Sequence, residues 1–254
     1  MVLAVDIGNT NIVLGCFEGD KILFTERVST KPSSTDLEYA TAFKMALNMH
    51  DYNSSMIDGA IISSVVPSVT NTVKRAIEKY ADVKVMVVGP GIKTGLSIKI
   101  DNPAQLGSDL AVDAVAGINE YPVPQIIIDM GTATTLSVID KNKNYLGGMI
   151  MTGMGVSTEA LTAKTSQLPK IAFEVPKKVI GTNTIDCMKS GVMYSNACAI
   201  DGLIERIEEE LGEKCTVVAT GGLAGVVMPL CKKKIILDDA LLLKGLMIIY
   251  NKNV

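Results

Sequence analysis

The sequence predicts an α/β protein built from two similar domains, and three observations support this fold class. Residues 2–29 contain three apolar, strand-like segments separated by tight turns. Helix-like and strand-like segments then alternate along the chain, which is typical of α/β folds. Beyond Pro124 the three-strand pattern starts again. We therefore expect two related domains, at residues 1–117 and 118–254.

The first domain opens with an antiparallel meander followed by alternating helices and strands. Strands are expected at 2–6, 11–17 and 21–29, an amphipathic helix at 36–50, a buried strand at 59–67, a helix at 68–80 and a strand at 83–88. The turns between the first three strands are Gly-Asn-Thr and Glu-Gly-Asp, which are typical hairpin connections.

The second domain repeats the meander from Gln125 onward and then becomes more helical. Helices are expected at 155–165 and 183–212, a strand at 216–222 and a last helix at 239–250. Periodicity does not decide whether this last helix packs on the first domain or on the second. Periodicity also does not decide whether the apolar side of the long helix beginning near Asn183 packs in the core of its own chain or forms a dimer interface.

Composition excludes several classes of protein. The chain has 254 residues, room for one large domain or two of about 125 residues, and 48% of its residues are hydrophobic, so disorder is excluded. The net charge is −3 and no basic stripe offers a nucleic-acid surface. Lys232-Lys233-Lys234 is expected to be a solvated segment before a strand.

Cysteine and histidine usage excludes other chemistry. The five cysteines are odd in number and have no Cys-x-x-Cys spacing, so we expect reduced core residues. The one histidine, His50, closes a helix without metal-ligand neighbours. No apolar run approaches the roughly 20 residues of a membrane span, and the first strand is too short for a signal peptide. We expect a soluble, cytoplasmic protein.

Asp6 ends the first apolar strand, and a carboxylate there is costly to desolvate unless it meets a cation, hydrogen-bond donors or water. An Asx turn that bonds its own backbone is the alternative. Asp129 and Gly131 repeat Asp6 and Gly8 at the same offset along the chain. Such turns offer carboxylates for cations and, through glycine, close backbone approach to phosphate. The short side-chain donors beside the turns are Asn9, Thr10, Thr132, Thr134 and Thr135.

Two further segments complete the candidate site. Gly221 and Gly222 follow an apolar strand and suit a loop lying against an adenine or ribose. Asp109 falls in the first turn of a predicted helix and is the candidate base for phosphoryl transfer to a hydroxyl. A helix N-terminal carboxylate stabilised by the dipole is the alternative for Asp109. Asp113, four residues on, is expected to be structural.

Together these segments resemble the type III pantothenate kinases, a family of the actin, sugar-kinase and heat-shock-ATPase superfamily. The resemblance spans essentially the full chain. Its motifs are DIGNTNIVLG at 6–15, ISSVVP at 62–67, GSD at 107–109, DMGTATT at 129–135, GGMIMTG at 147–153, GTNT at 181–184 and TGG at 220–222.

The resemblance implies two domains of the actin-like ATPase (ribonuclease H-like) fold with a nucleotide cleft between them. It implies a homodimer that uses ATP, magnesium and a monovalent cation, potassium or ammonium, to phosphorylate pantothenate in the first step of coenzyme A synthesis. Asp6 would hold the metal-phosphate end and Asp129 the monovalent cation. Phosphate would contact Asn9, Thr10, Gly131 and Thr132 and the turn at Gly8, and the nucleoside would contact Gly221 and Gly222.

At the acceptor end, the resemblance implies that Asp109 accepts the proton of the substrate hydroxyl, within a substrate site that includes Gly107 and Ser108. Thr184 would reach substrate from the partner subunit. The family motif usually reads Gly-Ala-Asp-Arg, and its arginine helps bind the pantothenate carboxylate, whereas this chain has Leu110. A tyrosine that often shares this task corresponds to Ile100. Thr152 stands where the family usually has proline.

These departures leave three hypotheses open. The chain is a pantothenate kinase with altered acceptor affinity, a kinase of the same fold for another small alcohol, or a nucleotide-binding regulatory protein whose acceptor chemistry has decayed. A lost contact to a buried carboxylate costs on the order of a few kcal/mol, or ten- to a thousand-fold in affinity. Retention of Asp109 argues against a pure binder. A DNA-binding activator is disfavoured by the absence of a basic stripe.

Overall fold

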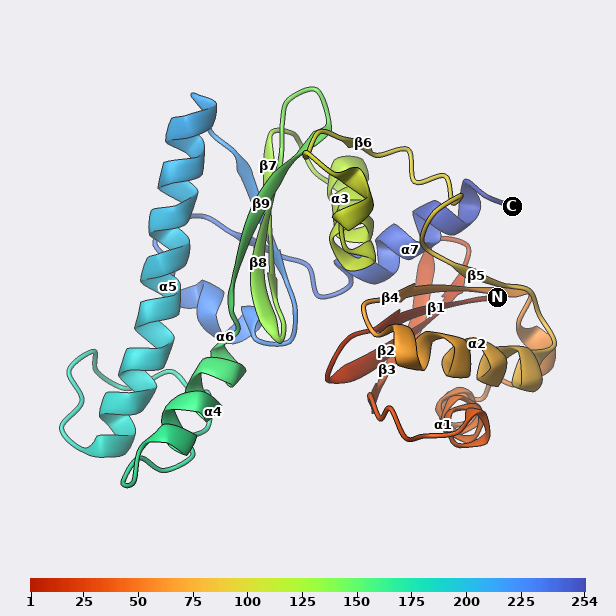
Figure 1. Ribbon diagram of the computed structural model, residues 1–254, viewed down its shortest axis with the longest axis horizontal. Coiled ribbons are helices and arrows are strands. Elements are labelled where there is room, and N and C mark those ends of the chain that lie inside the picture. The colour runs from red at the N-terminus through yellow and green to blue at the C-terminus, as the bar shows by residue number, and fades with distance from the viewer. The chain divides into compact units, whose positions relative to one another are not determined.

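The computed structural model describes residues 1–254 and divides into two compact units (Figure 1). The first unit comprises Met1–Leu96, Ala104–Ala116 and Leu241–Val254. The second comprises Ser97–Pro103 and Gly117–Ala240. Each unit contains one β-sheet with helices packed on it, which is the α/β organisation that the sequence predicts.

The sheet of the first unit has five strands. In order across the sheet they are β3 (Lys21–Ser29), β2 (Asn11–Glu18), β1 (Val2–Ile7), β4 (Gly59–Ser64) and β5 (Val85–Val87). β1, β2 and β3 pair antiparallel, which confirms the predicted meander. β4 pairs parallel with β1, and β5 pairs parallel with β4. The carboxyl ends of β1 and β4 therefore lie at the same edge of the sheet.

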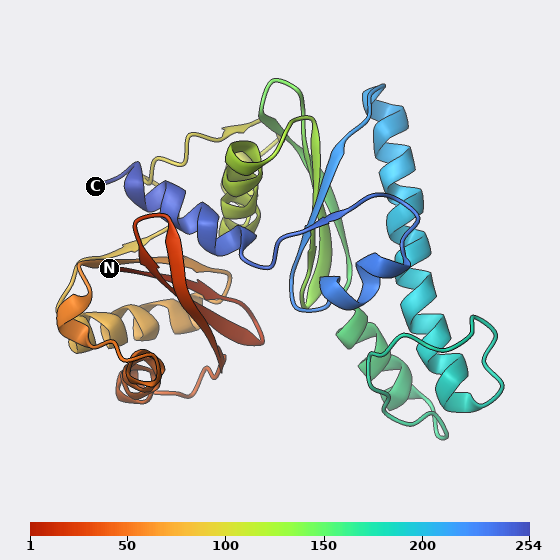
Figure 2. The same cartoon turned by 180° about the vertical axis from the view of Figure 1, so that it is seen from behind.

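Helices cover both faces of this sheet because alternate residues of a strand point to opposite sides. α1 (Asp36–Met49) and α2 (Pro67–Ala81) share one core with Leu3 and Val5 of β1. α3 (Ser108–Glu120) and α7 (Leu241–Asn251) share another with Ala4. Figure 2 shows α7 lying along the sheet of the first unit. The last helix thus packs on this unit, a point that the sequence left open.

Local signals at α1 explain where this helix begins and ends. The Thr35 hydroxyl accepts from the Glu38 N–H at 3.3 Å, and the Glu38 carboxylate accepts from the Thr35 N–H at 2.7 Å. This reciprocal capping box satisfies two backbone donors at the helix start. His50 is the C-terminal cap, with Nε2 2.9 Å from Glu26 Oε1 and its ring stacked on Phe24. The predicted place of His50 at a helix end is confirmed.

The sheet of the second unit has six strands. In order they are β11 (Ile236–Leu237), β10 (Thr216–Thr220), β7 (Gln125–Met130), β8 (Ala133–Ile139), β9 (Asn144–Thr152) and β6 (Ser97–Ile98). β7, β8 and β9 form the second antiparallel meander, which confirms the predicted repeat. β10 pairs parallel with β7, as β4 does with β1. The two units therefore share a meander with a parallel strand beside its first member.

The helices of the second unit are α4 (Met154–Lys164), α5 (Thr184–Leu211) and α6 (Ala224–Val227). α5 covers one face of the sheet and buries Met193, Ile200 and Ile204 against it (Figure 1). Asn183 caps its first turn by accepting from the Asp186 N–H, and Gly212 ends it in the left-handed conformation. Three short 3₁₀ helices complete the chain: η1 (Ser54–Met56), η2 (Pro103–Gln105) and η3 (Met228–Leu230).

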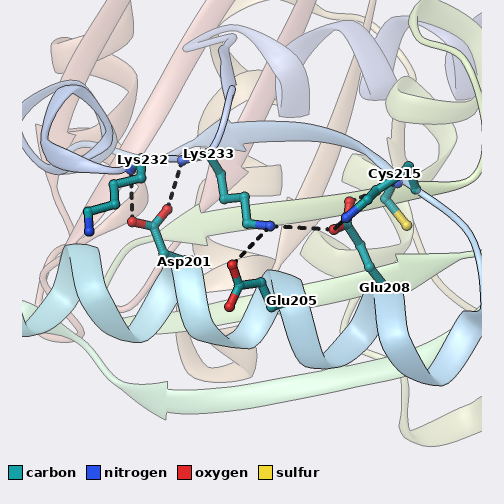
Figure 3. A network of polar contacts seen from close by, with 7 residues as sticks. Asp201, Glu205, Glu208, Cys215, Lys232 and Lys233 are labelled. Atoms are coloured by element: carbon teal, nitrogen blue, oxygen red, sulfur yellow. Dashed lines mark hydrogen bonds and ion pairs between the residues drawn. The ribbon is translucent and has the colours of Figure 1, made fainter.

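The lysine triplet differs from its prediction. It precedes a strand, β11, as expected, but it is not simply solvated. The Asp201 carboxylate accepts from the backbone N–H groups of Lys232 and Lys233 at 2.8 and 3.0 Å (Figure 3). Lys233 Nζ lies 3.3 Å from a carboxylate oxygen of Glu205 and 3.6 Å from one of Glu208. Both glutamates, like Asp201, belong to α5. Acidic residues spaced along α5 therefore bind this segment, a pairing that a linear sequence does not reveal.

The prediction of five reduced core cysteines is only partly right. All five are free, and Cys16 is buried, but Cys187 and Cys198 are exposed on α5. Each adjoins a buried residue, Met188 beside Cys187 and Ala197 beside Cys198, but adjacent residues of a helix point in different directions, so neighbouring hydrophobicity gave the wrong environment. None of the helices is both long and apolar enough to cross a membrane.

Candidate active site

The turn after β1 places its polar groups at the edge where β1 and β4 end. Asp6 lies inside β1, beside Ser63 of the parallel strand β4. The Gly8 N–H donates to the Asn11 carbonyl at 3.0 Å, and the Thr30 hydroxyl donates to the Gly8 carbonyl at 2.6 Å. The turn therefore closes through its own backbone. Asn9 and Thr10, predicted to contact phosphate, are exposed at its tip.

The first turn of α3 is hydrogen-bonded to the same edge. The Ser108 hydroxyl donates to the Ser64 carbonyl at 2.9 Å and accepts from the Ser64 N–H at 3.2 Å. It also lies 3.2 Å from the hydroxyl of the fully buried Ser63. Since Ser63 is the register neighbour of Asp6, the structure brings Asp6 and the Gly107–Asp109 segment to one edge of the first unit.

Asp109 is half-buried in the first turn of α3, as predicted. Its Oδ1 accepts from the Leu110 N–H at 2.8 Å. Gly107 leaves room for this carboxylate, because a Cβ at that position would lie 2.5 Å from Asp109 Oδ1. Burial raises the pKa of Asp109, although its backbone hydrogen bonds act in the opposite direction. A carboxylate with a raised pKa at a helix end is suited to accept a proton.

The turn after β7 is the corresponding edge of the second unit. Asp129 pairs in register with Thr220 of β10, and Gly221 follows directly. A Cβ on Gly221 would lie 2.4 Å from Asp129 Oδ1 and 2.6 Å from the Met130 nitrogen, and its φ is +93°. Only glycine fits this position without strain. The second loop therefore approaches Asp129 through bare backbone.

The other residues of the second edge also pack closely through their backbone atoms. The Gly131 N–H donates to the Ala133 carbonyl at 3.0 Å, and the Gly153 N–H donates to the Thr132 carbonyl at 3.2 Å. A Cβ on Gly153 would lie 2.2 Å from that Thr132 carbonyl oxygen. The structure thus brings together Asp129, Gly131, Thr132 and Gly221, with Gly222 next in the chain.

Two hydroxyls of β8, beside this edge, are buried and have no hydrogen-bond partner. They belong to Thr134 and Thr135, which pair in register with Met130 and Asp129. Adjacent residues of a strand point to opposite faces, so Thr135 is the one that shares a face of the sheet with Asp129. A buried hydroxyl without a partner is costly, and an ordered water or ion commonly relieves that cost. Oxygen donors beside a carboxylate are the ligands that hard cations prefer. The chemistry of this edge therefore fits a cation.

Ile100 and Thr184 are not among the predicted site residues that the fold places beside Asp129. Ile100 follows β6 and lies 3.8 Å from where a Cβ on Gly147 would stand. Thr184, at the start of α5, lines a cleft of about 800 Å³ between α4 and α5, whose lining contains none of the other predicted site residues. Asp113, predicted to be structural, is 1% exposed within α3.

Ser63 and Ser64 are site residues that sequence reasoning did not assign. The signal was present, because two adjacent serines end an otherwise apolar strand within the ISSVVP motif. Their hydroxyls at a strand terminus had no obvious partner until the fold placed Ser108 beside them. Only the parallel pairing of β1 with β4 reveals that they neighbour Asp6.

Comparison with solved structures identifies the fold. A putative 2-dehydro-3-deoxygalactonokinase from Sinorhizobium meliloti superposes with a TM-score of 0.62 at 11% identity, covering 99% of this chain and 96% of that one. A putative Baf family transcriptional activator from Campylobacter jejuni gives 0.59 at 18% identity, covering 98% of each chain. At such identities the likeness concerns the fold alone. The fold is that of the actin-like ATPases and sugar kinases.

Sequence comparison is more specific. The family model described as type III pantothenate kinase matches residues 2–206. A type III pantothenate kinase from Brevibacillus brevis is 44% identical over 253 residues, covering 100% of this chain and 99% of that protein. Another from Halalkalibacterium halodurans is 42% identical over 254 residues, covering 100% of both. The chain belongs to the type III pantothenate kinase family.

Proposed function

We propose that this protein transfers the γ-phosphate of ATP to pantothenate, giving 4'-phosphopantothenate in the first step of coenzyme A biosynthesis. Family membership supports the reaction. The observation that carries the mechanism is the edge of the first unit, where the first turn of α3 brings Asp109 to the strand ends beside Asp6. In this mechanism Asp109 accepts the proton of the substrate's primary hydroxyl as that oxygen attacks the γ-phosphate.

The two edges take different parts of the nucleotide in this proposal. Asn9 and Thr10, with the backbone of Gly8, bind phosphate oxygens from the first turn, and Gly131 and Thr132 do so from the second. Gly221 and Gly222 lie against the nucleoside. Gly221 lets this loop pack directly on Asp129 and Met130, which supports its place beside the second edge. We propose residues 1–117 and 118–254 as the two domains, with α7 returning to the first.

The residues at the first edge fit a divalent cation bound with ATP. Magnesium in such sites is held by one or two carboxylates together with substrate phosphates and water. The chain has no group of three or more histidine, cysteine, aspartate or glutamate side chains that could hold a metal by itself, so the phosphates must supply ligands. Asp6 is the carboxylate that we assign to this role. When bound, the cation neutralises charge that develops on the phosphates.

We assign a monovalent cation, potassium or ammonium, to Asp129. The supporting observation is the buried Thr135 hydroxyl, which has no protein partner and lies on the same face of the sheet as its cross-strand neighbour Asp129. Replacing potassium by sodium is expected to lower turnover of the wild-type protein. An Asp129→Asn variant that keeps the full difference between the two salts would contradict the assignment.

A homodimer formed through α5 belongs to the same proposal. The exposed side of α5 carries small, uncharged residues at roughly one-turn spacing: Cys187, Gly191, Ser195, Cys198 and, less exposed, Gly202. A Cβ on Gly191 or Gly202 would meet nothing within 4 Å, so packing inside this chain does not require either glycine. A mid-helix glycine costs roughly 0.5–1 kcal/mol relative to alanine.

We propose that these glycines are kept so that a second copy of the chain can approach, which would bring Thr184 near the partner's substrate. Sedimentation is expected to find a dimer in the wild type and a monomer in Gly191→Leu. A wild-type monomer at micromolar concentration would overturn the dimer. A cytoplasmic location accompanies this metabolic role as a prediction.

One observation favours a second candidate, a kinase of the same fold for another small alcohol. Leu110 stands directly after Asp109 and offers no charge to a substrate carboxylate. An alcohol without a carboxylate would avoid the cost of an unpaired anion at this place.

The test is ADP release by the purified protein with ATP, magnesium and potassium, while pantothenate is titrated to tens of millimolar. A parallel panel of primary alcohols that lack the carboxylate is measured under the same conditions. We expect pantothenate-dependent release with a raised half-saturating concentration. Release with another alcohol only would favour the second candidate. ATP binding without any acceptor-dependent release would contradict both kinase proposals.

A further inference from the structure

Thr30 follows the last residue of β3 and binds the turn between β1 and β2. Its hydroxyl donates to the Gly8 carbonyl at 2.6 Å, and its N–H donates to the Thr10 carbonyl at 3.0 Å. Because β2 lies between β3 and β1 in the sheet, the Thr30 side chain reaches past β2 to the end of β1. One residue therefore holds two carbonyls of the turn whose tip, at Asn9 and Thr10, is proposed to contact phosphate.

The backbone of Thr30 is fixed by contacts other than those of its hydroxyl. The neighbouring Lys31 N–H donates to the Tyr39 hydroxyl at 2.9 Å, and that hydroxyl donates to the Lys31 carbonyl at 3.0 Å. Tyr39 belongs to α1 and is 3% exposed, within the core of the first unit. Thr30 is therefore held from α1 on one side and from the start of β2 on the other.

The hydroxyl of Thr30 determines which way the peptide group between Gly8 and Asn9 points. This peptide is planar and trans, so its carbonyl and its N–H point to opposite sides. Since the carbonyl is directed at Thr30, the Asn9 N–H is directed away from it, and Asn9 is exposed. An outward backbone N–H at an exposed turn is a donor suited to an anion.

The backbone of the turn does not fix this peptide by itself. The Gly8 N–H donates to the Asn11 carbonyl, but the return bond, from the Asn11 N–H to the Gly8 carbonyl, is not made. Glycine has wide conformational freedom and asparagine tolerates left-handed backbone angles, so neither residue resists a reversal of the peptide between them. Without the Thr30 hydroxyl, this peptide can turn its carbonyl oxygen outward and its N–H inward.

We infer that Thr30 is a positioning residue for the nucleotide, in that its hydroxyl holds the Gly8–Asn9 peptide with the N–H outward, where it donates to a phosphate oxygen of ATP. This inference rests on the proposed role of the first turn in phosphate binding. Hydrogen bonds to charged groups are stronger than those between neutral groups. Loss of the Thr30 hydroxyl is therefore expected to raise the Kd of ATP by about tenfold or more.

The experiment compares Thr30→Val, which keeps the shape of the side chain, with Thr30→Ser, which keeps the hydroxyl. The control is Thr25→Val, at an exposed threonine of β3. The Kd of ATP, the half-saturating pantothenate concentration at saturating ATP and the thermal unfolding midpoint are measured for each. We expect a raised ATP Kd in Thr30→Val, with half-saturating pantothenate within about twofold of wild type. Thr30→Ser is expected to recover most of the ATP affinity, and Thr25→Val to match wild type.

Three outcomes would overturn the inference: an unchanged ATP Kd in Thr30→Val, an equal rise in half-saturating pantothenate, or no recovery in a folded Thr30→Ser. If Thr30→Val does not fold, Thr30→Ala replaces it, with the same rise expected. ATP titration needs no acceptor, which separates this inference from the proposed function. A wild type that binds ATP but releases no ADP with any alcohol contradicts the proposed function, while the Thr30 comparison still decides the inference. A wild type that does not bind ATP removes both.

Discussion

The two meanders of this protein share a backbone plan but differ in the strand beside them. In each, an aspartate is the last residue but one of the first strand, a glycine-containing turn follows, and a parallel strand lies alongside. Beside Asp6 the parallel strand ends in Ser63 and Ser64, whose polar groups bind Ser108. Beside Asp129 it ends in Thr220 and then Gly221, whose backbone presses against the carboxylate.

The two edges therefore present different groups: polar side chains at the first edge and closely packed backbone at the second. The first edge gathers hydroxyls and the half-buried Asp109 carboxylate, the groups that our proposal uses to orient and deprotonate an alcohol. The second edge gathers peptide groups and glycines, so it can lie against a nucleotide. Two meanders of the same plan can thus present different groups, depending on the residues that end the parallel strand beside each.

The largest expected effect comes from Asp109→Asn. Removing the base should lower kcat with pantothenate by about 10²- to 10⁴-fold. The matched control is Glu120→Gln, an exposed carboxylate at the other end of α3, which should keep wild-type kcat. Steady-state ADP release measures both. Equal kcat values for Asp109→Asn and the control would contradict the proposal that Asp109 accepts the hydroxyl proton.

The second edge is tested by Gly221→Ala. The new Cβ would collide with Asp129 and Met130 at a φ of +93°, so the loop must move. A residue in such a conformation costs on the order of 1–3 kcal/mol, and we expect the Kd of ATP to rise by about tenfold or more. Gly225→Ala in α6, where a Cβ meets nothing within 4 Å, is the control. Calorimetric titration that finds one ATP affinity for both variants would contradict a nucleotide role for this loop.

A smaller effect concerns stability and pH. Because burial raises the pKa of Asp109, the folded state holds this proton more tightly than the unfolded state does. Stability is therefore lost as pH rises from the ordinary carboxyl pKa through the raised one, and the loss is complete above it. Asp109→Asn should unfold at a higher temperature than wild type at pH 7, with the difference vanishing near the ordinary pKa of about 3.9. A pH-independent difference between the melting curves would count against a desolvated carboxylate.

The smallest effect on activity is expected at Lys233, away from both edges. Lys233→Met removes the contacts to Glu205 and Glu208 but leaves Lys214 2.7 Å from Glu208 (Figure 3). We expect a slightly lower unfolding temperature and a kcat within about twofold of wild type. Lys234→Met, which changes an exposed neighbour, should leave both values unchanged. A large loss of kcat in Lys233→Met would mean that activity is not confined to the two edges.

Much of the fold follows from the sequence because its signals are local. Alternation, turn glycines and caps define both meanders and the helices α1, α2, α4, α5 and α7. The two-residue strand β6 was not predicted, since it exists only through pairing with β9. The short helices α6 and η3 follow the glycine loop without a periodic pattern long enough to detect.

The candidate site was predictable where residue type determines the chemistry and not where the fold determines the neighbours. Asp109 in a first helical turn could be predicted from its own segment. The Ser63–Ser64–Ser108 contacts join segments that are distant in sequence, and nothing local indicates that they meet. The exposure of Cys187 and Cys198 likewise depends on which side of α5 faces the sheet.

The division of roles between the two edges is tested most directly by titrating ATP into Asp109→Asn and measuring pantothenate-dependent ADP release on the same preparation. We expect the ATP Kd to stay within about twofold of wild type while acceptor-dependent release falls by at least about 100-fold. Loss of ATP affinity together with turnover would contradict the account, because Asp109 would then belong to nucleotide binding or to folding. Retained turnover would contradict it as well.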